Sequence, residues 1–162
     1  MYVFDTSSLS ALFNFYPTIF TSLWDRFNDA VKQGNIISVL ESWNELQDRN
    51  KDVSINEWLK TNKNIFLPPD SEEAIFITTS LFTVKNGHFQ SLVEKAKRLK
   101  GGICADPFII AKAKIMGYSV VTEEGSKRGI QPNGAKIPNA CEFFDIKCIR
   151  LEQFMQLEKW SF

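Results

Sequence analysis

Short apolar runs alternate with longer segments of helical periodicity along the chain, and this alternation limits the folds open to it. The apolar runs are Tyr2-Val3-Phe4, Ile36-Ile37, Tyr118-Ser119-Val120-Val121-Thr122 and Lys147-Cys148-Ile149. Runs this short and apolar are typical of strands buried on both faces. Strands that alternate with helices favour a parallel sheet. The pattern therefore predicts an α/β fold with a mainly parallel central sheet.

Composition predicts one stable globular domain over residues 1–162. The 162 residues are 44% hydrophobic and include 14 Phe and 4 Trp, enough for a substantial core. We find no linker or repeat, no apolar run near the roughly 20 residues that cross a bilayer, and no signal-peptide pattern. The cysteines Cys104, Cys141 and Cys148 lack C-x-x-C spacing. We therefore expect a cytoplasmic protein with reduced thiols that does not associate with membranes.

Signals for helix starts and ends place helices between the strands. Ser38 and Glu41 match the S-x-x-E capping box, and Ser54 with Glu57 repeats it. Asp106, followed by a proline, is expected at a helix N-cap. The expected helices start at Thr6–Ser8 and cover about 17–34, 39–49, 68–84, 89–99, 106–117 and 152–160.

Acidic residues follow two of the expected strands. Asp5 comes directly after the first strand, and Glu124 comes just after the Val120-Val121 strand. The carboxyl ends of parallel strands meet at one edge of a sheet, where ligands bind. Asp106, at a helix start, is expected on the same edge, although an N-cap role alone would also explain it. Glu123, the neighbouring residue, is the alternative to Glu124 as the acid that follows the Val120-Val121 strand.

A further acid is expected from the helix after the second strand. The capping box accounts for Glu41, so we favour Glu45, one turn further along the same face. Converging carboxylates can hold a hard divalent cation, which activates water for attack on phosphorus without a side-chain nucleophile. The only histidine, His88, lies in an Asn-Gly-His turn and is expected to be exposed rather than catalytic.

Four motifs follow one another along nearly the whole chain. They are Asp5-Thr6-Ser7, Glu45-Leu46, Ala105-Asp106-Pro107 through Ala113, and Val120-Val121-Thr122-Glu123-Glu124. Their order resembles the PIN-domain nuclease family, nearest to a less characterised branch of the bacterial VapC-like toxins. The resemblance implies a three-layer α/β/α sandwich, one or two Mg²⁺ or Mn²⁺ ions, and cleavage of RNA.

The resemblance also implies roles for individual residues. The catalytic and metal-binding acids would be Asp5, Glu45, Asp106 and Glu124, of which Asp5 and Asp106 are the principal candidates. Glu124 stands where the family more often has Asp. The hydroxyls of Ser7 and Thr122 match positions that support the acids. Many relatives are toxins neutralised by a cognate antitoxin, so we expect an antitoxin partner beside the RNA substrate; homodimer formation stays open.

The net charge of zero, from 19 basic and 19 acidic residues, disfavours RNA binding by bulk electrostatics. The attraction must come from a local basic patch, bound metal or a partner chain. Lys127 and Arg128, in the loop after Glu124, are the expected substrate contacts. The run Lys95, Lys97, Arg98 and Lys100 is more typical of a solvated helix face.

Three other functions compete with the nuclease. The first is a non-catalytic PIN-like module that binds RNA or protein. The second is a phosphatase with Asp5 as nucleophile, which Ser7 disfavours because such enzymes commonly place a second Asp there. The third is an interaction protein, suggested by the aromatic content, but aromatic residues at helical spacing are more typical of a core. Examples are Phe13, Phe20, Trp24 and Phe27.

Overall fold

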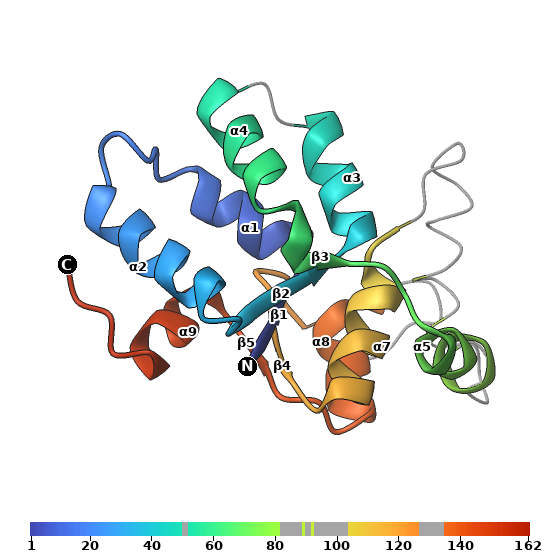
Figure 1. Ribbon diagram of the computed structural model, residues 1–162. Helices are drawn as coiled ribbons and strands as arrows, with labels where there is room; N and C mark the ends of the chain where they lie inside the picture. The colour runs from blue at the N-terminus through green and yellow to red at the C-terminus, as the bar shows by residue number, and fades with distance from the viewer. Residues whose placement is uncertain (50–51, 82–88, 90–91, 93–103, 127–134) are drawn as a thin grey trace.

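A five-stranded parallel sheet forms the centre of the computed structural model, which describes residues 1–49, 52–81, 89, 92, 104–126 and 135–162 (Figure 1). The strand order is β3-β2-β1-β4-β5, and every neighbouring pair is parallel. The strands are β1 (Tyr2–Phe4), β2 (Ile36–Val39), β3 (Phe66–Leu67), β4 (Ser119–Val121) and β5 (Cys148–Ile149). The predicted α/β fold with a parallel sheet is confirmed.

Helices connect the strands and cover the sheet. They are α1 (Thr6–Phe13), α2 (Thr21–Lys32), α3 (Leu40–Arg49), α4 (Val53–Thr61), α5 (Ser71–Phe76), α7 (Asp106–Met116), α8 (Ile137–Phe143) and α9 (Leu151–Leu157). A 3-10 turn, η1 (Lys63–Ile65), precedes β3, and a π-helical turn, η2 (Ile77–Leu81), continues α5. Within the described ranges, no helix combines the length and apolar character needed to cross a membrane.

Alternate residues of each strand point to opposite faces of the sheet, and each face has its own core. Phe4 and Val121 belong to a core with α1, α2, α3, α4 and α9, whereas Val3 and Val120 belong to a core with α7, α8 and η2. Figure 1 shows the helices on both sides of the strands. Burial of each such side chain contributes roughly 1.5–3 kcal/mol. The three-layer α/β/α sandwich is thereby confirmed.

The aromatic residues expected in the core divide into two groups. Phe13, Trp24 and Phe27 are buried, and their rings pack against one another and against Trp58. Phe20, by contrast, is 43% exposed. It precedes α2, which begins at Thr21 rather than near Pro17, so Phe20 is not on the buried face of that helix.

Both predicted capping boxes are wrong. Ser38 lies within β2, and its Oγ donates to the carbonyl of Phe4 at 2.6 Å, because the buried strand continues to Val39. Ser54 lies inside α4, whose N-cap is Asp52; the Asp52 carboxylate accepts from the backbone N–H of Ser54 at 2.9 Å. Strand β3 and helix α8 were not predicted, and the helix expected over 89–99 lies outside the described residues, apart from positions 89 and 92.

A buried ion pair joins α5 to α7. Lys112 Nζ lies 2.6 Å from Glu73 Oε1 and donates to the carbonyl of Pro68 at 3.0 Å. Lys112 is 3% exposed and Glu73 is 0% exposed. A charge this deeply buried is tolerated only when it is paired, so the pair fixes α5 against the sheet-covering helix α7.

Candidate active site

The direction of the strand order reverses between β1 and β4, and parallel α/β sheets form a crevice outside the carboxyl ends of the strands at such a point. From β1 the chain continues to β2 and β3 on one side of β1, and it then returns to form β4 and β5 on the other side. Such a reversal of direction is where parallel α/β sheets bind ligands. Asp5 follows β1 and Thr122 follows β4, and Thr122 Oγ1 donates to Asp5 Oδ2 at 2.8 Å. The crevice therefore contains two residues predicted for the site.

Asp5 is the most firmly held acid of the crevice. Ser7 Oγ lies 3.0 Å from its Oδ1 and 2.8 Å from its Oδ2, and the backbone N–H of Ser8 donates to Oδ1 at 2.7 Å. Asp5 is thus the N-cap of α1. Burial raises the pKa of Asp5, and the hydrogen bonds from Ser8, Thr122 and Ser7 act in the opposite direction. These contacts fix the orientation of the carboxylate.

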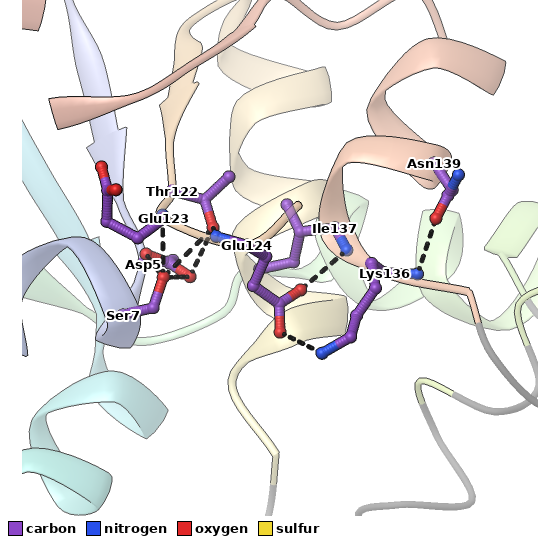
Figure 2. Close-up of polar contacts among 8 residues, drawn as sticks. All are labelled: Asp5, Ser7, Thr122, Glu123, Glu124, Lys136, Ile137 and Asn139. Carbon is purple, nitrogen blue, oxygen red and sulfur yellow. Dashed lines mark hydrogen bonds and ion pairs between the residues drawn. The ribbon is translucent and has the colours of Figure 1, made fainter. Parts of the chain in front are cut away.

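Ser7 and Thr122 also position the segment after β4. The Ser7 and Thr122 hydroxyl oxygens lie 3.3 Å apart. Ser7 Oγ accepts from the backbone N–H of Glu123 at 2.9 Å, and Thr122 Oγ1 accepts from that of Glu124 at 3.1 Å (Figure 2). Both hydroxyls expected to support the acids therefore contact Asp5 and the backbone that carries the fourth acid.

Glu123 and Glu124 point in different directions, as Figure 2 shows. Glu123 Oε1 accepts from the backbone N–H of Leu151 at 2.8 Å, at the start of α9. Glu124 instead accepts from Lys136 Nζ at 3.0 Å and from the backbone N–H of Ile137 at 3.1 Å. Glu124, and not Glu123, is the acid on the Asp106 side.

Glu45 links three helices at the crevice. Thr6 Oγ1 of α1 donates to Glu45 Oε2 at 2.7 Å, and the backbone N–H of Ala105, before α7, donates to Glu45 Oε1 at 3.1 Å. The sequence favoured Glu45 over Glu41 because Glu41 matched a capping box with Ser38. That capping box does not form, because Ser38 lies in β2. These contacts now give Glu45 an independent place beside Asp106.

Glu41 is buried, with 6% of its surface exposed. Its Oε2 has no hydrogen-bond partner in the part of the chain that the structure describes. Burial raises the pKa of Glu41, while the nearby Lys112 lowers it. Glu41 therefore lies toward the ion pair between Lys112 and Glu73. The negative charge of Glu45, one turn further along α3, also raises the pKa of Glu41.

Asp106 does not cap α7, contrary to the prediction. It is the first residue of that helix, the N-cap is Ala105, and no side chain caps the helix. The backbone N–H groups of Phe108 and Ile109 both donate to the Ala105 carbonyl at 3.0 Å. The helix thus starts one residue earlier than the sequence indicated, and the Asp106 carboxylate is not used as a cap.

The charges of the other three acids raise the pKa of Asp106. Burial raises the pKa of Asp106 to about 6, and the negative charges of Glu124, Glu45 and Asp5 add to that increase; the Cys104 thiol opposes it by hydrogen bonding. Burial is the largest cause of the increase, and the neighbouring carboxylates act in the same direction because like charges disfavour ionisation. The four acids predicted from separate segments therefore share one electrostatic environment centred on Asp106.

Lys136 is the residue of this crevice that sequence reasoning missed. Its ion pair with Glu124 crosses the segment between β4 and α8, and the pKa of Lys136 is raised mainly by that hydrogen bond. Nothing in the local sequence distinguishes it from a surface lysine before a helix. The expected substrate contacts, Lys127 and Arg128, lie outside the described residues.

The donor chemistry of the crevice fits a hard divalent cation. Within the described residues, no three Asp, Glu, His or Cys side chains form a ready-made metal-binding group. Mg²⁺ does not need one, because it keeps several waters and usually binds proteins through one or two carboxylates. Asp106 could bind directly and Glu45, Glu124 or Asp5 through water, and a cation there would relieve the repulsion on Asp106.

A family model described as a domain of unknown function, DUF4411, matches residues 2–162. The chain belongs to the DUF4411 family. Neither the curated proteins nor the solved structures contain a significant match to it. The match covers all four acids, so the crevice lies wholly within the DUF4411 domain.

Proposed function

We propose that this DUF4411 chain is a metal-dependent endoribonuclease that cleaves RNA phosphodiester bonds with a metal-activated water. The observation that carries the proposal is the gathering of four carboxylates, from four separate segments, at the crevice between β1 and β4. The four are Asp5, Glu45, Asp106 and Glu124. No buried histidine or serine–histidine pair is needed for this chemistry.

Each residue has a distinct contribution in the proposal. Asp5, fixed by Ser7 and Thr122, presents its carboxylate in one orientation. Among the described residues, Asp106 has fewer hydrogen bonds than the other three acids, which makes it the acid most available to a cation. A bound Mg²⁺ or Mn²⁺ would supply water activation and stabilisation of the leaving oxygen. Lys136, already paired with Glu124, provides a positive charge that can face a phosphate.

RNA as the substrate rests on the resemblance of the four motifs to VapC-like PIN nucleases. We extend the proposal accordingly to a toxin that acts in the cytoplasm and is neutralised by a small cognate antitoxin. Expression of the chain in bacteria should arrest growth, and co-expression of the neighbouring gene's product should relieve the arrest. Growth unaffected by a cleavage-competent chain would remove the toxin role and leave the nuclease.

Cleavage of labelled RNA by the purified full chain tests the enzyme directly. We expect cleavage with Mn²⁺ or Mg²⁺, none with EDTA, and a loss of at least about a hundredfold in Asp5→Asn and Asp106→Asn. Asp25→Asn, at an exposed position on α2, is the matched control and should cleave normally. Equal cleavage by all four proteins would reveal a contaminant and contradict the site.

A non-catalytic RNA-binding or protein-binding module is the second candidate. The ion pair of 3.0 Å between Lys136 and Glu124 favours it, because a lysine already neutralises the fourth acid. A folded wild-type chain that binds RNA but cuts none at any Mn²⁺ concentration would support the module over the enzyme.

A further inference from the structure

A pocket adjoins the acids on the β5 side of the crevice. Its volume is about 420 Å³, and Thr122 and Glu124 form part of its wall. Pockets for small ligands occupy roughly 300–1,000 Å³, so this one can hold a single nucleotide. Figure 1 shows α8 and α9, which both contribute lining residues, on opposite sides of the sheet.

Polar side chains from α8, from α9 and from the turn before α9 also line this pocket. Glu142 comes from α8, Gln153 from α9, and Arg150 from the turn between β5 and α9. Gln153 Oε1 accepts from the backbone N–H of Arg150 at 3.0 Å, and the same amide carries two N–H donors on Nε2. Among the described residues, no carboxylate forms an ion pair with Arg150.

Apolar groups complete the pocket. Pro138, Ile146 and Ile149 line it together with the polar side chains. The exposed wall is mainly polar, so it offers hydrogen-bonding groups to the edge of a planar base and a smaller apolar area to one of its faces.

We propose that this pocket binds the nucleotide next to the scissile phosphate and prefers guanine. A glutamate carboxylate can accept two parallel N–H donors, and among the four RNA bases only guanine offers an adjacent pair, N1–H and N2–H₂. The Gln153 amide can donate to guanine O6, and Arg150 can bind the phosphate with two N–H groups. The inference rests on the proposed function only for the scissile bond; base binding itself requires no cleavage.

Calorimetric titration of the full chain with GMP, AMP, CMP and UMP in EDTA tests the pocket without cleavage. We expect GMP to bind about tenfold or more tightly than the other three nucleotides. Glu142→Gln should remove that preference, and Arg150→Gln should weaken GMP about tenfold. The matched controls are Glu152→Gln and Lys147→Gln, exposed positions that do not line the pocket, and both should bind GMP normally.

Two results would overturn the proposal that this pocket binds guanine nucleotides. One is the absence of GMP binding at about 1 mM, and the other is equal affinity for all four nucleotides in the wild type and in Glu142→Gln. GMP binding by a chain that never cleaves RNA would leave the pocket and remove the proposed enzyme. Cleavage of RNA without any GMP binding would leave the enzyme and remove the pocket.

Discussion

Thr122 Oγ1 donates a hydrogen bond of 2.8 Å to Asp5 Oδ2, which joins the ends of two neighbouring parallel strands. Because Thr122 is 1% exposed and Asp5 is 4% exposed, no water can replace this bond easily. The same hydroxyl accepts from the backbone N–H of Glu124. One side chain thus orients the first acid and the segment that carries the fourth.

Thr122→Val should therefore impair both stability and cleavage. The substitution keeps the shape but leaves a buried carboxylate oxygen with one donor fewer, which costs about 1–3 kcal/mol in the free energy of unfolding. Cleavage should fall about 10–100-fold because the acid loses its orientation. Urea unfolding and RNA cleavage measure the two effects. Thr122→Ser retains the hydroxyl and should keep most of both; wild-type cleavage by Thr122→Val would show that this bond does not matter.

Asp106→Asn should stabilise the fold while it abolishes cleavage. The folded-state pKa of Asp106 is raised to about 6, above the ordinary 3.8, so stability falls as pH rises between these values. At about 1.4 kcal/mol per pKa unit, the ionised side chain costs about 1–3 kcal/mol above pH 6. The gain in Asp106→Asn, measured by urea unfolding, should be present at pH 7.5 and disappear near pH 4. A variant less stable than wild type at pH 7.5 would contradict the crowding of the acids.

Glu123→Gln and Glu124→Gln form a matched pair at adjacent positions. Glu124→Gln should lose most metal-dependent cleavage, because it removes a charge beside Asp106. Glu123→Gln should keep cleavage and cost up to about 1 kcal/mol of stability, because Glu123 accepts from the start of α9. Cleavage assays and urea unfolding of both variants check the assignment. The reverse pattern would make Glu123 the fourth acid.

Lys112→Met should strongly destabilise the fold. It leaves Glu73 charged and unpaired in the core, which costs about 3–5 kcal/mol. The double variant with Glu73→Leu removes both charges and should recover most of that loss. A double-mutant cycle in urea measures the coupling; strictly additive losses would show that the two charges do not interact.

The fold was predictable to a large extent because burial leaves a clear pattern in the sequence. The strand that ends at Asp5 and the strand before Thr122 are short apolar runs, so the parallel sheet and the crevice followed from them. The strand at Ile36 is longer than predicted, because Ser38 was assigned to the capping box of the following helix. Its hydroxyl is satisfied by the Phe4 carbonyl on the neighbouring strand, a contact that local sequence does not contain.

The individual roles of the acids were less predictable, because they depend on contacts between distant segments. The sequence assigned the N-cap to Asp106, but the structure assigns one to Asp5. Glu45 was chosen through a capping box that does not exist, and its place rests instead on Thr6 and Ala105. Lys136 was missed because its ion pair forms only when the start of α8 lies beside Glu124, a contact between distant parts of the chain.

Binding of Mn²⁺ to the full chain, followed by calorimetry at pH 7.5, tests the central claim that the acids around Asp106 form a metal centre. We expect the wild type and Glu123→Gln to bind Mn²⁺ alike, and Asp106→Asn to bind it about tenfold or more weakly. In the same preparations, the wild type and Glu123→Gln should cleave RNA alike, and Asp106→Asn should cleave it much more slowly. Equal Mn²⁺ affinity in the wild type and Asp106→Asn, or undiminished cleavage in EDTA, would contradict the account.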